Sequence, residues 1–208
     1  MADLLSINPY ALDSHAIRQA AQKITNGGVA VVPTDTVYAI VCGVDDRNAA
    51  QKLYRIKGLE ANDITKPLSV LCYDLASVSE YTRGMPNSAY RIMRRVLPGP
   101  YTFILNASKR IPAAALQGRK TIGIRIPDHP VILALLRELN SPLLATSVVH
   151  DDVDSLLDDP VAISVRLGRD VDLVVDAGPI FPEPSTVIDY TSGEAVILRA
   201  GKGSIEDI

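Results

Sequence analysis

Residues 31–41 read VVPTDTVYAIV and carry the strongest structural signal in the chain. This apolar run follows the pair Gly27-Gly28, which is typical of a helix end, so we expect a strand that enters a buried sheet. Pro33 lacks a backbone N–H, which fits a strand end or a bulge better than the middle of a central strand. The stretch therefore predicts buried β-structure with an irregularity at Pro33.

The polar residues of this stretch indicate a binding pocket. In an extended chain the hydroxyls of Thr34, Thr36 and Tyr38 would share one face, with Asp35 and Val37 on the other. Hydroxyls grouped on otherwise apolar β-structure suit a pocket that hydrogen-bonds a small polar ligand. Threonine and tyrosine are also good strand formers, so the same pattern fits a strand that binds nothing.

Helical and strand patterns alternate along most of the remaining chain. Helices are predicted between Ser14 and Gly27, between Asp46 and Lys57, after Asp74, and at 87–97, 130–139 and 161–167. Strands are predicted at 68–72, 101–105, 121–126, 142–149, 171–175, 185–190 and 195–199. A turn at residues 191–194 joins the last two strands into a hairpin. This order predicts a single domain over residues 1–208, an α/β sandwich around a twisted mixed sheet.

Composition restricts the class of protein. Apolar residues make up 47% of the 208 and aromatic residues 5%, with no tryptophan, so we expect an aliphatic core. Cys42 and Cys72 lie in apolar surroundings and form no Cys-x-x-Cys pair, which favours a reduced, cytoplasmic protein. No basic leader opens the chain and no apolar run approaches about 18 residues, so neither export nor a membrane span is expected.

Charge is distributed unevenly along the chain. A net charge of −3 argues against a protein that binds nucleic acid over its whole surface. Residues 52–125 nevertheless contain 13 Lys and Arg against 4 Asp and Glu, and residues 151–208 contain 4 against 13. The first segment could form a basic face that attracts phosphate. Alternatively, both sets cover solvated surfaces and neutralise each other after folding.

Motif spacing excludes several kinds of site. Gly201-Lys202 suggests a P-loop, but Val196 stands where the first glycine belongs and Gly203 stands where Ser or Thr is needed. No Gly-x-Ser-x-Gly or Cys/His nucleophile pattern is present, which argues against an acyl-enzyme hydrolase. No metal site is expected, because the histidines are scattered without ligand spacing, at His15, His129 and His150.

Six motifs, taken in order, resemble the YrdC/YciO family. The first is residues 33–39, PTDTVYA. The others are residues 97–105, 121–130, 145–147, 184–189 and 198–201. The resemblance covers residues 10–203 and implies a YrdC-like α/β sandwich with a concave basic groove.

The better-known members of that family make L-threonylcarbamoyladenylate for the threonylcarbamoyladenosine modification of tRNA. In them bicarbonate carboxylates threonine, and the carbamate attacks the α-phosphate of ATP and releases pyrophosphate. The resemblance therefore implies a nucleotidyltransferase with ATP as substrate, Mg²⁺ as an accompanying ion and no tightly bound cofactor. Such chemistry needs hydroxyls and cations for the amino acid, and cations where negative charge builds on phosphate.

The resemblance also assigns site residues by their positions in the motifs. The residues expected to face the amino acid are Thr34, Thr36, Tyr38, Arg125 and Ser185. The residues expected to face nucleotide or phosphate are Lys57, Lys66, Thr146, Ser147 and Arg199. Lys57 and Arg125 are the expected catalytic residues. Gly123 shares a strand face with Arg125 and leaves room for a ligand, although an ion pair of Arg125 with Asp35 or Asp189 is the alternative.

The chain departs from the active members of the family at three positions. Their Lys-x-Arg is Lys57-Gly58-Leu59 here, their Ser-x-Asn is Ser147-Val148-Val149, and a histidine that contacts threonine in some relatives is absent near Leu71. The leucine in place of the arginine removes a charge-assisted phosphate contact worth about 1.5–3 kcal/mol. The pattern resembles the YciO branch and predicts weakened or altered activity.

Three functional hypotheses remain. The first is an enzyme of the threonylcarbamoyladenylate type, with a nucleotide and a threonine-like molecule as ligands. The second is a module that binds tRNA or double-stranded RNA through the basic groove without catalysis, as described for the YciO branch. The third is a folded relative without chemistry. A monomer or a weak homodimer, with no membrane partner, is expected in each case.

Overall fold

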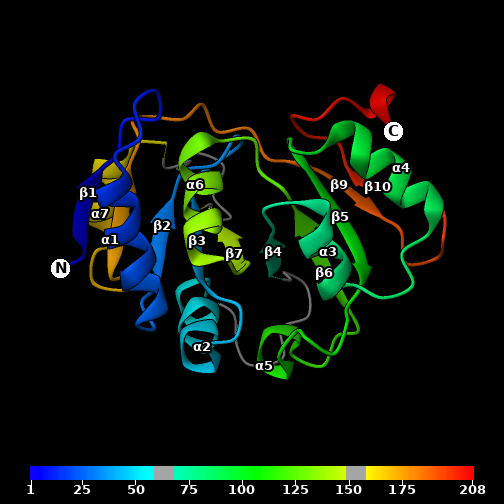
Figure 1. The fold of residues 1–208 in the computed structure, drawn as a ribbon, viewed down its shortest axis with the longest axis horizontal. Coiled ribbons are helices and arrows are strands. Elements are labelled where there is room, and N and C mark those ends of the chain that lie inside the picture. The colour runs from blue at the N-terminus through cyan, green and yellow to red at the C-terminus, as the bar shows by residue number, and fades with distance from the viewer. Residues whose placement is uncertain (59–67, 149–157) are drawn as a thin grey trace.

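The computed structural model describes residues 1–58, 68–148 and 158–208. Within these ranges ten strands form one sheet, accompanied by seven α-helices and one short 3₁₀ helix (Figure 1). The strands are β1 (Asp3–Ser6), β2 (Ala30–Val32), β3 (Ala39–Gly43), β4 (Ser69–Leu71), β5 (Tyr101–Asn106), β6 (Thr121–Arg125), β7 (Leu143–Ser147), β8 (Leu173–Asp176), β9 (Thr186–Asp189) and β10 (Val196–Arg199). The helices are α1 (Ser14–Thr25), α2 (Arg47–Ile56), α3 (Leu75–Tyr81), α4 (Asn87–Val96), α5 (Ala113–Leu116), α6 (Pro130–Leu139), α7 (Pro160–Leu167) and η1 (Ile205–Asp207).

The sheet mixes parallel and antiparallel pairs. Its strand order is β1-β8-β2-β3-β7-β4-β6-β5-β9-β10. The pairs β1–β8, β2–β8, β4–β6 and β5–β9 are parallel, and the other neighbours are antiparallel. The predicted α/β fold around a twisted mixed sheet is confirmed, and the predicted hairpin β9–β10 lies at one edge of the sheet.

The helices lie close to where the sequence predicted them, and capping side chains define where several of them begin. The carboxylates of Asp13 and Asp46 accept hydrogen bonds from the first turns of α1 and α2, which fixes where these helices begin. Ile17 of α1 packs with Val32 of β2 in one apolar cluster, whereas Leu53 of α2 belongs to a second cluster. Layers of helix thus cover the sheet on both faces. No helix in the described ranges is long and apolar enough to cross a membrane.

The stretch 31–41 folds as two strands and a loop, not as one extended strand. β2 ends at Val32, and β3 begins at Ala39 and pairs antiparallel with β2. In the loop between them, Thr34 Oγ1 donates to the carbonyl oxygen of Val37 at 2.6 Å and accepts from its N–H at 3.3 Å. The expected alternation of three hydroxyls is therefore wrong, because Pro33 ends the strand and Thr34 closes a local turn.

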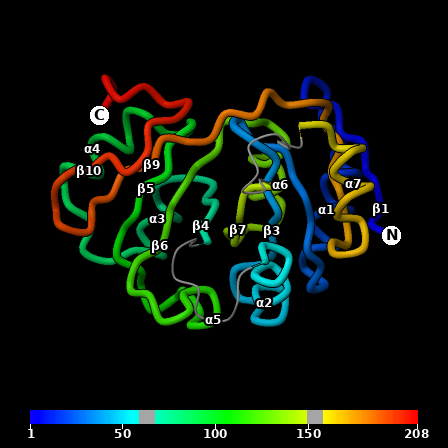
Figure 2. Tube along the Cα trace, turned by 180° about the vertical axis from the view of Figure 1, so that it is seen from behind, coloured from blue at the N-terminus to red at the C-terminus, as the bar shows by residue number. Residues whose placement is uncertain are grey.

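A long segment at residues 177–185 connects β8 to β9 across the top of the molecule (Figures 1 and 2). Hydrogen bonds join it to residues 33–38, the loop after β2, near both of its ends. The Tyr38 hydroxyl donates to the carbonyl oxygen of Gly178 at 2.8 Å, and Glu183 N donates to the carbonyl oxygen of Thr36 at 3.2 Å. The segment ends at Ser185 and so brings this residue to the same region as the loop 33–38.

Candidate functional site

A cavity of about 530 Å³ lies over one face of the sheet. Residues of β3, β4, β5, β6, β7, β9 and β10 line it, together with the C-terminal ends of α2 and α7. Its volume is in the range of small-molecule sites. Among the described residues its lining contains no carboxylate and four cationic side chains, namely Lys57, Arg125, Arg166 and Arg199. The cavity therefore favours a ligand that carries negative charge.

Small residues on adjacent strands make room for the cavity. Ala145 of β7 is paired in register with Ser69 of β4, and Ser69 is paired with Gly123 of β6. All three residues line the cavity. A Cβ atom on Gly123 would lie 2.6 Å from Ser69 Oγ and 3.2 Å from Thr102 Cγ2. The absence of a side chain at Gly123 therefore keeps this part of the sheet surface open beside Arg125.

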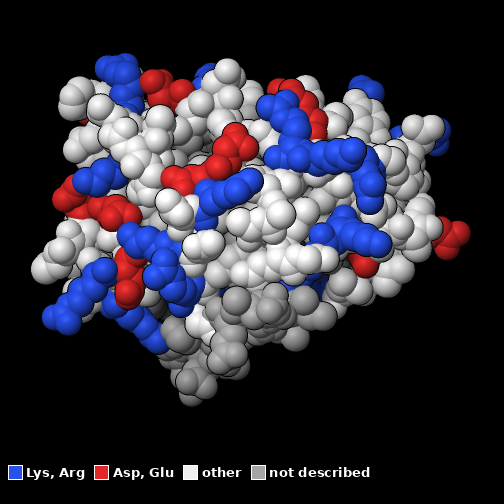
Figure 3. Space-filling model, turned by 90° about the horizontal axis from the view of Figure 1, so that it is seen from below, with Lys and Arg blue, Asp and Glu red and all other residues white. Residues whose placement is uncertain are grey.

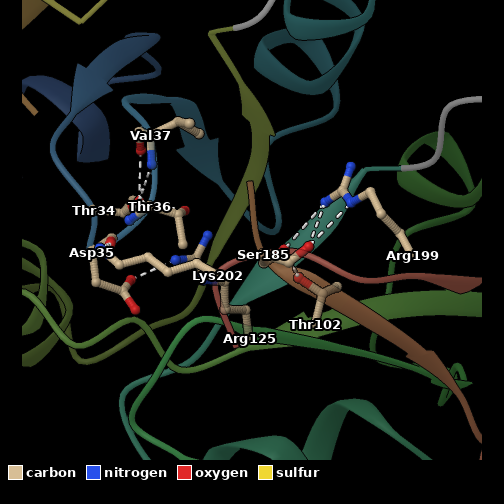
Figure 4. Close-up of polar contacts among 9 residues, drawn as sticks. All are labelled: Thr34, Asp35, Thr36, Val37, Thr102, Arg125, Ser185, Arg199 and Lys202. Atoms are coloured by element: carbon tan, nitrogen blue, oxygen red, sulfur yellow. Dashed lines mark hydrogen bonds and ion pairs between the residues drawn. The ribbon is translucent and has the colours of Figure 1, made fainter. Parts of the chain in front are cut away.

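Arg125 lies at the end of β6 and is paired with Asp35. Its Nη2 donates to Asp35 Oδ1, and the two side chains are 9% and 10% exposed (Figure 4). Burial lowers the pKa of the Arg125 guanidinium, an effect that the Asp35 carboxylate opposes and that nearby Arg199 reinforces. Arg125 lines the cavity together with Thr34 and Ser185, as expected. The prediction that the Arg125 side chain is left open for a ligand is wrong in this respect, because the alternative, an ion pair with Asp35, is formed.

A second arginine organises the opposite side of the cavity. Arg199 on β10 donates through Nε and Nη2 to the carbonyl oxygen of Ser185, at 3.1 and 2.8 Å. The Ser185 hydroxyl lies 2.8 Å from the Thr102 hydroxyl and also accepts from Arg199 Nη2 at 3.4 Å (Figure 4). These contacts fix a hydroxyl and a guanidinium side by side on the cavity wall.

Two residues expected to face the amino acid lie away from the cavity lining. Thr36 is fully buried, and its hydroxyl lies 3.2 Å from that of Thr34. The Tyr38 hydroxyl accepts from the N–H of Ala177 as well as donating to Gly178, and its burial raises the pKa of Tyr38 to about 12. The expectation that both hydroxyls join Thr34 at the cavity is wrong, because residues 33–38 form a turn. Both side chains position the loop that carries Thr34.

The residues expected to face phosphate are partly brought together. Lys57, Thr146, Ser147 and Arg199 all line the cavity. Lys66 lies outside the described residues, as do Leu59 and Val149, the two positions that depart from the active family pattern. Leu71, where a histidine is absent, is buried and lines the cavity. The ligand contacts of all these residues stay predictions.

The structure adds residues to the cavity that the sequence did not single out. Arg166, in the last turn of α7, lines the cavity although it is about 110 residues from Lys57 in the chain. Ser69 and Thr102 contribute two further hydroxyl groups. An arginine in the last turn of a helix has an ordinary role at the helix dipole, so the sequence offered no signal that would separate Arg166 from other surface arginines.

The molecular surface does not form one uninterrupted basic face in the view of Figure 3. Basic side chains are interspersed there with acidic ones. Segments of opposite charge also form ion pairs, such as Lys52 with Asp172 at 2.8 Å. In the described ranges no group of three or more His, Cys, Asp or Glu residues could hold a metal ion. The described cavity lining, by contrast, contains four cationic side chains and no carboxylate.

The fold is a mixed α/β sheet that carries a cavity of small-molecule size lined by hydroxyl groups and cations. The Sua5/YciO/YrdC family model, described as telomere recombination, matches residues 22–201, so the chain belongs to this family. YciO of Escherichia coli is 38% identical over 99% of this chain and 98% of its own length. Its crystal structure superposes with a TM-score of 0.91, at 37% identity, and covers 100% of this chain and 99% of that one.

Two more distant relatives bear on function. Threonylcarbamoyl-AMP synthase of Bos taurus is 32% identical over 90% of this chain and 68% of its own length. The structure of Pyrococcus abyssi Sua5 complexed with L-threonine has a TM-score of 0.86 at 25% identity. It covers 98% of this chain, which spans 59% of that protein. The predicted family is confirmed, and its members include threonylcarbamoyl-AMP synthases.

Proposed function

We propose that this cavity binds L-threonine, or a similar small amino acid, together with ATP, and that the protein performs threonylcarbamoyl-AMP synthase chemistry in a weakened or altered form. The observation that carries the proposal is the grouping of Arg125, Thr34 and Ser185 in one cavity with Lys57, Arg166 and Arg199. The first three residues supply partners for a carboxylate and a hydroxyl. The other cations supply partners for phosphate. The synthases and the threonine complex among its relatives support this assignment.

The proposed reaction assigns a task to each group. The amine of threonine takes up bicarbonate with loss of water, and an oxygen of the resulting carbamate attacks the α-phosphorus of ATP as pyrophosphate leaves. Arg125 is the proposed partner of the amino-acid carboxylate, because its planar guanidinium suits two parallel hydrogen bonds. Lys57 is the proposed catalytic cation at the phosphates, where negative charge builds in the transition state.

Mg²⁺ is proposed to accompany ATP. Mg²⁺ keeps several waters and binds through substrate phosphates and one or two protein groups. The described cavity lining offers the hydroxyls of Thr146 and Ser147 and no carboxylate, so the phosphates would hold most of the ion's coordination shell. A tightly bound cofactor is not part of the proposal.

Arg166 is proposed to contact the phosphates of ATP. We expect Arg166→Ala to weaken ATP binding about tenfold, because one charge-assisted hydrogen bond is lost, and to leave threonine binding unchanged. Arg169→Ala is the matched control, since Arg169 is exposed three residues further along the chain and does not line the cavity. Isothermal titration of both variants with ATP measures the difference. Equal ATP affinities in the two variants would remove Arg166 from the site.

The function itself is tested by titrating the protein with L-threonine, with ATP and with both in bicarbonate. We expect binding of both ligands, and release of pyrophosphate about a hundredfold slower than in a relative with complete Lys-x-Arg and Ser-x-Asn motifs. A titration with tRNA at increasing salt separates the second candidate function, because binding through phosphate contacts falls steeply as salt rises. Salt-sensitive RNA binding without any threonine or ATP binding would favour the RNA-binding module.

A further inference from the structure

Lys202, in the segment after β10, is bonded to two elements that border the cavity. Its backbone N–H donates to the carbonyl oxygen of Pro184 at 2.9 Å. Its side-chain Nζ donates to the carbonyl oxygen of Asp35 at 2.6 Å (Figure 4). Pro184 lines the cavity, and Asp35 directly follows Thr34, which also lines it. One residue thus joins the segment 177–185 to the loop 33–38.

The backbone on both sides of Lys202 is held tightly against the start of β9. Thr186, which is fully buried, accepts from Gly201 N at 3.0 Å and donates to the carbonyl oxygen of Gly203 at 2.5 Å. A Cβ atom on Gly201 would clash with the carbonyl oxygen of Pro184. The chain at residues 201–203 therefore has a fixed position, and only the Lys202 side chain spans the distance to the loop 33–38.

The contact with Lys202 bears on two groups of the site through the backbone of Asp35. Among the described residues, Lys202 is the hydrogen-bond partner of that backbone, whereas the Asp35 side chain is paired with Arg125. Where the Asp35 backbone lies decides where its carboxylate meets Arg125 and where the preceding Thr34 borders the cavity. Lys202 does not line the cavity itself, so any effect on a ligand is transmitted through the loop.

We propose that Lys202 is a positioning residue, and that residues 201–203 form a strap that sets the spacing between the loop 33–38 and the segment 177–185. The consequence for a ligand rests on the function proposed above. The strap holds Thr34 and Ser185 at the separation that the amino acid requires, from outside the cavity and without touching the ligand. A site whose groups are already in place loses less free energy on binding than one that must be ordered. The Gly-Lys pair that lacks a P-loop context thus has a task in this fold.

Hydrogen exchange of the full chain, followed by mass spectrometry, tests the strap without any ligand. Lys202→Met keeps a long side chain and removes the donor. We expect the backbone amides of residues 33–38 to exchange about fivefold faster in this variant, because a hydrogen bond that holds the loop is lost. Lys202→Arg retains a cationic donor and should exchange at the wild-type rate. Lys109→Met is the control, because Lys109 is exposed and does not line the cavity.

Isothermal titration of the same variants measures the effect on the site. We expect Lys202→Met to weaken L-threonine binding about fivefold, and Lys202→Arg to restore it. The affinity for ATP alone should be unchanged in both variants, because none of the residues proposed to bind phosphate lies on the loop 33–38. Urea denaturation serves as the check on folding, and its midpoint should be the same in Lys202→Met and Lys109→Met.

The outcomes separate this inference from the proposed function. Unchanged exchange of residues 33–38 in Lys202→Met would overturn the strap, whatever the ligands do. Equal loss of threonine and ATP affinity, or a loss that Lys202→Arg does not restore, would overturn the positioning role, since a general disturbance of the fold has those results. Absence of threonine binding to the wild-type protein would instead refute the proposed function, and the exchange rates would still decide whether Lys202 holds the loop.

Discussion

Replacing Arg125 with alanine is expected to lower the free energy of unfolding by about 3–5 kcal/mol, because the substitution leaves the buried Asp35 carboxylate without its partner. The same change should abolish threonine binding, since the proposed partner of the ligand carboxylate is removed. Urea denaturation measures the first effect and isothermal titration of the folded variant measures the second. An affinity for threonine equal to that of the wild-type protein would exclude Arg125 from the ligand site.

The double variant Asp35→Ala/Arg125→Ala separates stability from binding. Removing both charges of a buried pair costs far less than removing one, so most of the lost stability should return. Threonine binding should stay absent, because the proposed partner of the ligand carboxylate is still missing. If the double variant is no more stable than Arg125→Ala, the ion pair does not explain the cost of the single substitution.

Replacing Gly123 with valine is expected to block the cavity. A Cβ atom at this position already approaches Ser69 Oγ to 2.6 Å, and the two methyl groups of valine would extend into the space beside Arg125. We expect threonine affinity to fall at least about a hundredfold and the free energy of unfolding to fall by about 1–3 kcal/mol through overpacking. Titration and urea denaturation measure the two effects.

Gly43→Val provides the matched control for this substitution. Gly43 is also a strand glycine, but the nearest atom to a Cβ there, Asp46 Cβ, is 4.0 Å away, and Gly43 does not line the cavity. Threonine affinity should therefore be unchanged in Gly43→Val. Unimpaired threonine binding by Gly123→Val would show that the ligand does not occupy the space above β6.

Most of the fold could be predicted from the sequence because its signals are local. Capping aspartates and apolar spacing placed α1 and α2, and the strand patterns of β5, β6 and β7 agree with the structure to within a residue or two at most ends. β1 was not predicted, since it has four residues and an exposed burial pattern. α5, with four residues, was missed because a single turn carries no periodicity.

The site was harder to predict because it depends on contacts between distant segments. Thr34 and Ser185 were expected at one cavity with Arg125, and the fold places them there. Thr36 and Tyr38 were assigned by an alternation that requires an extended chain, and the turn after Pro33 removes it. The choice between a free Arg125 and a pair with Asp35 needed coordinates, because the two residues are 90 positions apart. Coordinates were also needed to place Arg166 at the cavity, because it is distant in the sequence from the other residues that line it.

A crystal structure of the protein with L-threonine and an ATP analogue that cannot be cleaved between the α- and β-phosphates tests the proposed function most directly. We predict that the threonine carboxylate lies on Arg125 in the cavity over β6, and that the phosphates lie near Lys57, Arg166 and Arg199. A cavity that is empty at saturating ligand, or threonine bound elsewhere on the molecule, would contradict the assignment of this cavity as an amino-acid and nucleotide site.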